Sequence, residues 1–399
     1  MSTAKVALAH ASPAGGSAMA GDELIAAARE AAAVAQRFAD DVDHEARFPH
    51  EAFEVLRQKG LLGAMVPAVL GGSGAPLATV AAICRVLGET CASTGMIYAM
   101  HQIQVACLLE HGMGSPWHQQ MLARVAGEQL LLASATSEEA IGGALRSSGC
   151  AVNVEGDRFH LLKMAPTISY GAHADGILIT ARRHADASPS DQVLVCALKD
   201  DYTLQSLNAW DTLGMRGTCS NGFRLEAAGQ VDQVLPVPFG EIADATMTPV
   251  SHILWSALWL GISGDAVSRA KTFFQGQARA RPGQLPPSAP RVAEAVSLLQ
   301  MMEARVDMAL ERQRARHAGA SVSAAFALAA EMNGLKTAMS TMALDVVQQA
   351  LLVCGMAGYK QGTPFSLGRH LRDLWSAPLM INNDRIQTNT ANLLLADRS

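Results

Sequence analysis

The spacing of apolar residues changes twice along this chain of 399 residues, and these changes constrain its fold more than any other feature. From Asp22 to about Glu128, apolar residues recur at the three- and four-residue spacing of helices. Between about Leu131 and Pro238 they form short runs separated by turn residues, which predicts strands. From about Asp244 the helical spacing returns in longer segments. This order lacks the alternation of strands and helices that is typical of a nucleotide-binding parallel sheet.

The same changes divide the chain into a tail and three domains. We expect a flexible tail over residues 1–21, where Gly, Ser, Pro and Ala dominate, and an N-terminal α-helical domain over residues 22–128. A middle antiparallel β-domain of sandwich or barrel type is expected over residues 129–238, and a C-terminal four-helix bundle over residues 239–399. The predicted fold class is therefore α+β.

Individual elements and loops can also be predicted. Residues 67–74 combine a proline with three glycines, and the segment Arg281–Pro290 is rich in proline, so both are expected to be loops between helices. The predicted strands are Leu131–Ala135, Gly149–Val154, Phe159–Leu162, Gly176–Thr180, Gln192–Ala197 and Phe223–Leu225, and the predicted long helices are Ser251–Ala278, Arg291–Ala318 and Ala324–Cys354.

Composition argues against several classes of function. The formal net charge of −5 comes from 36 acidic and 31 basic residues without a block of like charge, which argues against a nucleic-acid partner. Seven cysteines without a C-x-x-C pair match neither a disulfide framework nor a zinc site, so no metal is expected. The N-terminal apolar stretch is too short for a signal peptide, and the apolar segment Ile253–Ile262 is about half the ~20 residues that cross a bilayer. We therefore expect a cytoplasmic protein that does not engage a membrane.

Four local strings carry a more specific signal. They lie in the first helical region, in the β-region at two places, and near the C-terminus. Together they resemble the signature strings of the acyl-CoA dehydrogenase superfamily of flavoproteins, and the resemblance covers most of the chain after about residue 22. One departure is the loop after Glu138, where Glu139, Ala140, Gly143 and Ala144 replace the usual residues. The strings are Phe48-Pro49 with Gly60-Leu61-Leu62-Gly63, Pro67 and Gly71-Gly72-Ser73-Gly74; Ser137-Glu138 with Thr167-Ile168-Ser169-Tyr170-Gly171; Leu213-Gly214-Met215-Arg216-Gly217-Thr218-Cys219-Ser220; and Cys354-Gly355-Met356-Ala357-Gly358-Tyr359 with Arg369 and Arg372-Asp373.

The resemblance implies one flavin per subunit, FAD or alternatively FMN. It implies flavin contacts from Thr136, Ser137 and Ser169, with Ser169 as the hydroxyl donor near flavin N5. Hydroxyl donors suit the pyrimidine side of the ring, because charge develops there when the flavin is reduced. Arg216 would anchor a phosphate or ribose. The further candidates for cofactor binding are Thr218, Asn383 and Arg385, and, for an ADP half shared with a neighbouring subunit, Arg279 or Arg281 with Gly355 and Gly358.

Acyl-CoA dehydrogenation also requires a base that removes a proton next to the thioester carbonyl, commonly a glutamate. The position that resembles the family's usual glutamate is Ile381, and the alternative position falls on Ser251 or His252. No carboxylate stands at either place. The remaining candidate catalytic residues are His101, His252 and Asp384.

Three functional hypotheses follow from the resemblance. The leading one is an FAD-dependent oxidoreductase of acyl-CoA dehydrogenase type that acts on an acyl-CoA or acyl thioester and passes electrons to an electron-transfer flavoprotein. The alternative is a group D flavin-dependent monooxygenase that uses flavin reduced outside by a flavin reductase; such an enzyme needs no carboxylate, and His101 would face the flavin in it. The third is a non-catalytic flavin-binding relative.

The C-terminal helices also predict an oligomer. The runs Ile253–Trp255, Leu258–Leu260 and Ala343–Val353 are apolar on more faces than one bundle interior requires. We therefore expect a homotetramer, or at least a homodimer.

Overall fold

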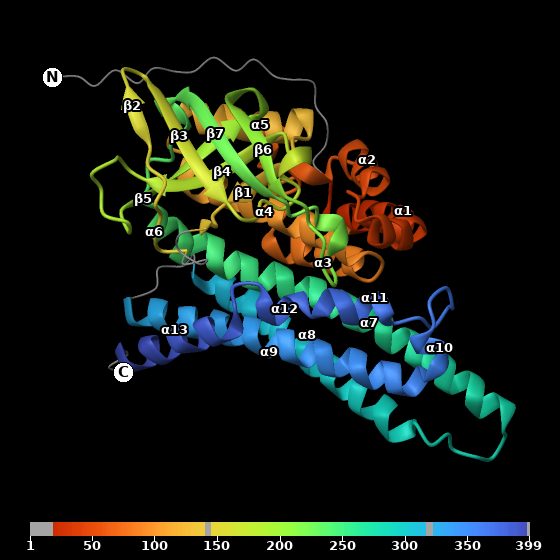
Figure 1. The fold of residues 1–399 in the computed structure, drawn as a ribbon. Helices are drawn as coiled ribbons and strands as arrows, with labels where there is room; N and C mark the ends of the chain where they lie inside the picture. The colour runs from red at the N-terminus through yellow and green to blue at the C-terminus, as the bar shows by residue number, and fades with distance from the viewer. Residues whose placement is uncertain (1–18, 140–144, 317–321, 397–399) are drawn as a thin grey trace.

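The computed structural model describes residues 19–139, 145–316 and 322–396. Five helices come first, seven strands follow, and a second group of helices completes the chain, which confirms the predicted α+β fold class. The strands and the first helices lie side by side above the long C-terminal helices (Figure 1). The bounds are α1 Gly21–Glu45, α2 His50–Gln58, α3 Leu77–Gly88, α4 Ala92–Gly112 and α5 Pro116–Glu128; β1 Leu132–Ala135, β2 Asn153–Glu155, β3 Arg158–Ala165, β4 Gly176–Arg182, β5 Gln192–Leu198, β6 Tyr202–Asn208 and β7 Gly222–Gln230; and α6 Phe239–Ile242, α7 Thr248–Ala280, α8 Ala289–Arg316, α9 Val322–Cys354, α10 Met356–Tyr359, α11 Gly368–Leu374, α12 Ser376–Leu379 and α13 Asn383–Ala396.

The N-terminal helices pack around α4, which is buried over most of its length. Helix α1 buries an alanine-rich face at helical spacing, and it ends where Ala46 adopts a left-handed conformation with φ of 51°. The predicted loop over residues 67–74 is compact, since a Cβ at Gly72 would lie 2.1 Å from the carbonyl oxygen of Val66. Only glycine fits at that point of the loop.

The strands form two sheets, with orders β1-β4-β5 and β2-β3-β7-β6. Strand β1 pairs with β4 in parallel, with Leu132 opposite Gly176, whereas all the other paired strands are antiparallel. This pairing differs from the wholly antiparallel domain expected from sequence, because the chain passes through β2 and β3 of the second sheet before it returns as β4. Strand β6 (Tyr202–Asn208) was not predicted, because it is mostly exposed and has few apolar residues.

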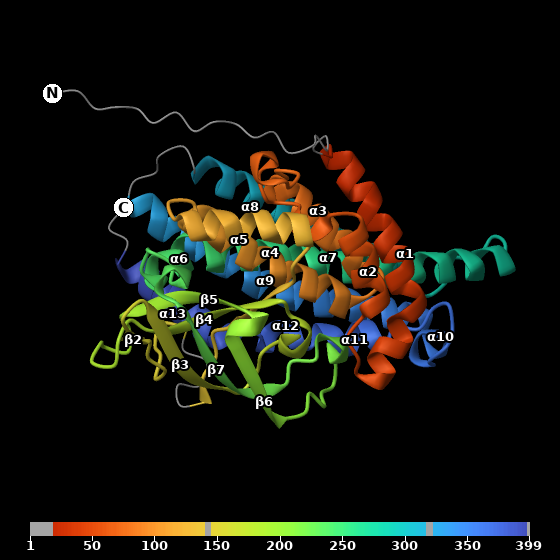
Figure 2. The same ribbon diagram turned by 90° about the horizontal axis from the view of Figure 1, so that it is seen from above.

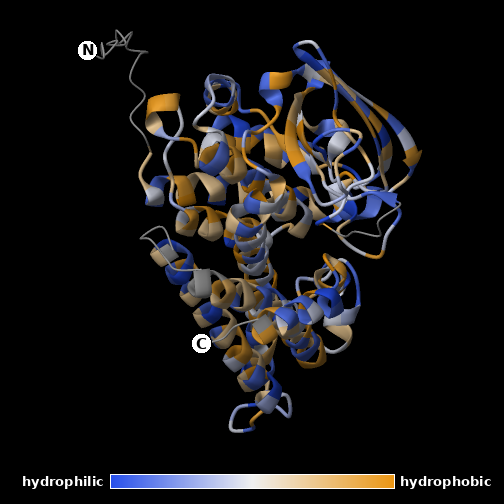
Figure 3. Ribbon diagram, turned by 90° about the vertical axis from the view of Figure 1, so that its left-hand side faces the viewer, coloured by the Kyte–Doolittle hydropathy of each residue, from blue (hydrophilic) through white to orange (hydrophobic). Residues whose placement is uncertain are grey.

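Strand β3 shows why the four-stranded sheet could be predicted. Its residues alternate between exposed and buried along all eight positions. The strands of this domain carry both hydrophilic and hydrophobic residues (Figure 3). One of the buried positions is Lys163, a charged residue whose role is described below.

The long helices α7, α8 and α9 pack against one another, with α13 against α9. Helix α7 also contacts α3 and α4, and the view from above shows it beneath the N-terminal helices (Figure 2). Its apolar residues, such as Ile253 and Trp259, are completely buried within one chain. The part of the oligomer argument that used these residues is therefore wrong, because other helices of the same chain cover them.

Helix α9 is the most apolar long helix of the described residues. Its segment Phe326–Cys354 is long and apolar enough by length and composition to cross a membrane, and 44% of its most apolar window is buried. It packs between α7, α8 and α13, as a core helix of a bundle does. The exposed apolar residues of this region are Phe326, Leu352, Met356, Tyr359, Leu394 and Leu395, and the oligomer remains a prediction that rests on them.

Candidate functional site

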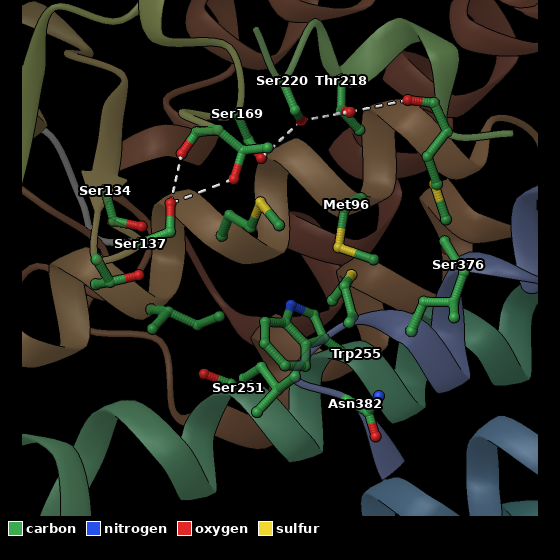
Figure 4. A pocket seen from close by; sticks show the side chains of 18 of the residues that line it. Met96, Ser134, Ser137, Ser169, Thr218, Ser220, Ser251, Trp255, Ser376 and Asn382 are labelled. Carbon is green, nitrogen blue, oxygen red and sulfur yellow. Dashed lines mark hydrogen bonds between the residues drawn. The ribbon is translucent and has the colours of Figure 1, made fainter. Parts of the chain in front are cut away.

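A pocket of about 720 Å³ lies where the N-terminal helices, the β-domain and the C-terminal helices meet. Its walls come from α4, the end of β1, the loop before β4, the turn at residues 216–218, the start of α7 and the segment that joins α12 to α13 (Figure 4). This volume lies in the range of small-molecule and cofactor sites, roughly 300–1,000 Å³. The pocket is therefore large enough for a ring system and a small substrate together.

Hydroxyl groups form the wall that the β-domain contributes. Ser137 Oγ donates to the carbonyl oxygen of Thr167 at 3.0 Å, and the hydroxyls of Ser220 and Ser169 lie 2.8 Å apart. The Thr218 hydroxyl lies 2.8 Å from the Ser220 hydroxyl, so three hydroxyls form a hydrogen-bonded chain (Figure 4). Such a wall can offer several neutral donors and acceptors to a bound ring.

Four of the cofactor-binding residues predicted from sequence line this pocket together: Thr136, Ser137, Ser169 and Thr218. Arg385 also lines it, from the first turn of α13. The fold thus brings together residues that are as far as 249 positions apart in the sequence, from 136 to 385.

Within this chain the Arg216 guanidinium is held by the protein, and its predicted contact with a phosphate or ribose stays a prediction. Arg216 does not line the pocket, and its guanidinium is engaged by protein acceptors. Its Nε donates to the carbonyl oxygen of Asp43 at 2.7 Å, and its Nη1 donates to Asp211 at 3.0 Å and to the carbonyl oxygen of Thr212 at 2.9 Å. Arg216 therefore ties the turn at residues 216–218 to the end of α1.

The string that contains Gly214 and Met215 docks against the Arg372-Asp373 pair of the C-terminal string. Asp373 accepts a hydrogen bond from the backbone N–H of Met215 at 2.6 Å, and a Cβ at Gly214 would lie 2.2 Å from the carbonyl oxygen of Arg372. Arg372 in turn pairs with both carboxylate oxygens of Asp43. Burial raises the pKa of Asp373 to about 6, against lowering contributions from Met215 and neighbouring arginines. Sequence reasoning missed this docking, which fixes α11 and α12 at the pocket.

Asn383 supports the pocket from behind. Its Oδ1 accepts from Lys336 Nζ at 2.8 Å, and its Nδ2 donates to Ser340 at 2.9 Å. Burial lowers the pKa of Lys336 to about 8. Asn383 does not line the pocket and fixes the start of α13 on α9, and its predicted cofactor contact stays a prediction.

The four residues predicted for an ADP half do not line the pocket of this chain. Arg279 and Arg281 lie at the far end of α7. Gly355 has φ of 55° and ψ of −133°, a conformation that favours glycine at the turn from α9 to α10. A Cβ at Gly358 would lie 2.8 Å from the Cβ of Cys354, so this glycine is needed for packing. A role toward a neighbouring subunit stays a prediction for all four.

Glu138 forms a buried ion pair behind the hydroxyl wall. Its Oε1 accepts from Lys163 Nζ at 2.7 Å, and its Oε2 accepts from the backbone N–H of Gly149 at 2.6 Å. Lys163 also donates to the carbonyl oxygen of Thr180 at 2.7 Å. Burial alone would raise the pKa of Glu138, but Lys163 and these donors lower it. The carboxylate is therefore a structural anion that holds the residues after β1, and the loop residues 140–144 that follow lie outside the described part of the chain.

His101, a predicted catalytic residue, has both of its ring nitrogens engaged by the fold, and its catalytic role stays a prediction. Its Nε2–H donates to the carbonyl oxygen of Leu62 at 2.8 Å, and its Nδ1 accepts from the backbone N–H of Leu132 at 3.0 Å. Complete burial lowers its pKa to about 4. His101 is thus a neutral connector between α4, the GLL string and β1, and it does not line the pocket.

The other two catalytic candidates, His252 and Asp384, also lie outside the lining of the pocket. His252 is buried against α9, where its Nδ1–H donates to the carbonyl oxygen of Met332 at 3.0 Å, and burial lowers its pKa to about 4. Asp384 is exposed in the first turn of α13 and does not line the pocket. Neither His252 nor Asp384 lines this pocket, and their catalytic roles stay predictions. Ile381 does line it, with φ of 49°, which is unusual for a β-branched residue.

The chemistry of the lining is distinctive. Among the described residues that line the pocket there is no Asp, Glu, His or Lys, and the charged residues there are Arg372 and Arg385. Residues 140–144, outside the described part, have the sequence Ala-Ile-Gly-Gly-Ala and so carry no carboxylate. The remaining lining consists of hydroxyls, amides, methionines, tryptophans and aliphatic side chains.

Comparisons with known proteins agree with this fold. Residues 22–129 match the family model described as Acyl-CoA dehydrogenase, N-terminal domain. L-evernosamine nitrososynthase of a Micromonospora species is 31% identical over 256 residues, which are 60% of this chain but only 58% of that protein. The chain thus spans less than two thirds of this relative's length in the match.

Two solved structures show how far the fold extends. FMN-bound TdsC from Paenibacillus sp. A11-2, a dibenzothiophene monooxygenase, has a TM-score of 0.83 at 19% identity, covering 94% of this chain and 98% of that one. Butyryl-CoA dehydrogenase from Megasphaera elsdenii has a TM-score of 0.79 at 16% identity, with the same coverage of 94% and 98%. The family model matches the N-terminal domain, and the two solved structures show that the chain as a whole has the same fold as they do.

Proposed function

We propose that this protein is a flavin-dependent monooxygenase that uses reduced flavin supplied from outside the chain, with a flavin reductase as its partner. The observation that carries the proposal is the absence of any Asp, Glu, His or Lys among the described residues that line the pocket. Proton abstraction next to a thioester carbonyl needs such a base, which typically contributes about 10²–10⁴-fold to the rate. Oxygen transfer from a flavin does not need such a base.

The residues of the pocket fit a flavin ring. The hydroxyl wall that contains Ser137, Ser169 and Ser220 supplies neutral donors and acceptors along one side, which suits the pyrimidine edge of the ring. The opposite wall, from α4, α7 and the residue before α7, is mostly apolar, with Met96, Met247 and Trp255, and its polar members are Gln104, Thr248 and Ser251. FMN or FAD would both present the same ring to this wall, and the bound reduced flavin would supply the electrons and, with oxygen, the oxygen atom that enters the substrate.

The chain's own groups would orient the ring and exclude water. Ser169 would hold the ring through its hydroxyl, and Ser220 and Thr218 would hold Ser169. The large side chains of Trp255 and Trp375 would keep water from the reacting face, which favours oxygen transfer over loss of the oxidising equivalent. Arg372 is already paired with Asp43 and would act as a structural group at the rim.

The comparisons support the proposal through the reactions named for the similar proteins. The nitrososynthase and the dibenzothiophene monooxygenase are both oxidative enzymes, and one structure of the latter is FMN-bound. Acyl-CoA dehydrogenation, the leading hypothesis from sequence, is the alternative, and the fold shared with butyryl-CoA dehydrogenase favours it. The absence of Asp, Glu, His and Lys from the described lining of the pocket counts against acyl-CoA dehydrogenation.

Two reactions on one preparation test the proposal. In the first, oxidised flavin-loaded protein is mixed anaerobically with butyryl-CoA or octanoyl-CoA and a dye acceptor, and we expect no sustained dye reduction. In the second, the protein receives reduced FMN and air, and we expect it to delay the return of the oxidised-flavin absorbance relative to free reduced FMN. Rapid dye reduction in the first reaction would refute the proposal and establish the dehydrogenase alternative.

A further inference from the structure

The helical wall of the pocket contains two buried polar groups that have no hydrogen-bond partner among the described residues. They are Nε1 of Trp255 on α7 and Oε1 of Gln104 on α4. Trp255 is 6% exposed and Gln104 is 3% exposed, and both line the pocket. Buried polar groups are nearly always paired in folded proteins, so two unpaired groups that face one pocket require an explanation.

We propose that Trp255 and Gln104 select the substrate, which we infer to be an uncharged and mostly apolar molecule with one hydrogen-bond acceptor and one N–H or O–H donor. The indole N–H can only donate, so it calls for an acceptor on the ligand. The amide oxygen can only accept, so it calls for a donor. The assignment of this wall to the substrate rests on the proposed function, which places the flavin against the hydroxyl wall.

The position of Trp255 supports this role. Its indole nitrogen points from α7 into the pocket, on the side of Met96 (Figure 4). By contrast, Nε1 of Trp259, one turn further along α7, is also unpaired but does not line the pocket. Trp255 therefore belongs to the wall of the pocket, and Trp259 does not.

The position of Gln104 is equally specific. Its Nε2 donates to the carbonyl oxygen of Met100 in the preceding turn at 3.4 Å, which leaves Oε1 for a ligand. Around it the helical wall is formed by Ile103 and Met247, with no charged residue of α4 or α7 in the described lining. Because a charged ligand group would be desolvated there without a counter-ion, the ligand must be neutral at this end.

Three probes of nearly the same shape test the inference: indole, which offers an N–H donor; indanone, which offers a carbonyl acceptor; and indene, which offers neither. Binding of each is measured at equilibrium by isothermal titration calorimetry on the full chain, with and without FMN. The variants are Gln104→Leu and Trp255→Phe, and Trp259→Phe is the matched control outside the pocket.

We expect Gln104→Leu to weaken indole binding about 2- to 10-fold and to leave indanone unchanged, as the loss of one neutral hydrogen bond predicts. Trp255→Phe should weaken indanone binding by a similar factor and leave indole unchanged, and neither variant should weaken indene binding. Trp259→Phe should change none of them. An unchanged circular dichroism spectrum and an unchanged urea unfolding midpoint show that each variant is folded.

Equal changes for all three probes would overturn the inference, because the variants would then have altered only the shape of the pocket. Unchanged binding of indole and indanone, or no binding of any probe to the wild type, would overturn it as well. These measurements involve no turnover, so they stand or fall separately from the reaction with reduced flavin and oxygen.

Discussion

Breaking the buried Glu138–Lys163 pair should destabilise the protein and loosen the hydroxyl wall. The pair is enclosed, since the side chains of Lys163 and Glu138 are 0% and 6% exposed. Lys163 also donates to both oxygens of Thr180, which joins the two sheets behind the pocket. Residues Thr136 and Ser137 immediately precede Glu138, so this pair positions them.

The expected magnitude follows from the burial of the two charges. Lys163→Met leaves the Glu138 carboxylate without its counter-ion, and Glu138→Gln leaves a fully buried ammonium beside a neutral amide. Removing one partner of a buried pair costs about 3–5 kcal/mol. The double variant removes both charges, so its cost should not exceed that of either single variant, which gives a coupling energy of at least about 3–5 kcal/mol.

Urea unfolding at neutral pH, followed by circular dichroism, measures these free energies. The exposed pair Arg183–Asp191 in the same domain, at 3.1 Å, is the control, and its double-mutant cycle should give about 0–1 kcal/mol. Flavin affinity, measured in parallel, should fall in both single variants of the buried pair. Additive costs in the cycle, or single costs below about 1 kcal/mol, would refute the reasoning that the pair is buried and coupled.

Four further predictions follow from the site and the surface. Ile381→Glu should raise dehydrogenation of octanoyl-CoA with a dye acceptor above the wild-type level by at least about tenfold if position 381 can serve a base, and an unchanged rate would show that it cannot. Ser169→Ala should weaken flavin binding about 2- to 13-fold in a fluorescence titration, and unaltered affinity would contradict its role in the hydroxyl wall. Because the pKa of Asp373 is raised in the folded state to about 6 from 3.8, its contribution to stability is complete below the lower value and is lost as pH rises through the higher one. Asp373→Asn should remove that loss, about 3 kcal/mol between about pH 4 and pH 7, in urea unfolding at the two pH values, and an unaltered pH dependence would contradict the shift. Light scattering should give a mass above that of the 42.0 kDa monomer, and a monomer at micromolar concentration would contradict the expected oligomer.

Periodicity was sufficient to predict most elements of the fold. Helices α7 and α9 and strand β5 lie close to their predicted limits, because their apolar residues follow one clear period over many turns or positions. The exposed edge strand β6 and the parallel pairing of β1 could not be predicted, since neither the polar composition of an edge strand nor the direction of pairing is encoded in a local apolar pattern. The end of the predicted helix at Ala318 lies outside the described residues.

The site was predicted in part, for a reason that Ser169 and His101 illustrate. Ser169 belongs to a motif that lies in the loop between β3 and β4, and it lines the pocket. His101 was chosen for its chemistry and its helix, but the direction of a side chain on a helix buried on all sides cannot be read from the sequence. The same limit applies to Trp255 and Gln104, whose missing partners only the three-dimensional arrangement reveals.

The reaction of protein-bound reduced FMN with oxygen tests the proposed function most directly. Anaerobic protein with one equivalent of reduced FMN is mixed with oxygenated buffer in a stopped-flow spectrometer, and the return of the oxidised-flavin absorbance is followed. We predict that the return is delayed relative to free reduced FMN and that Ser169→Ala shortens the delay. A return as fast as that of free reduced FMN, together with rapid anaerobic bleaching of the oxidised flavin by an acyl-CoA, would contradict the proposal.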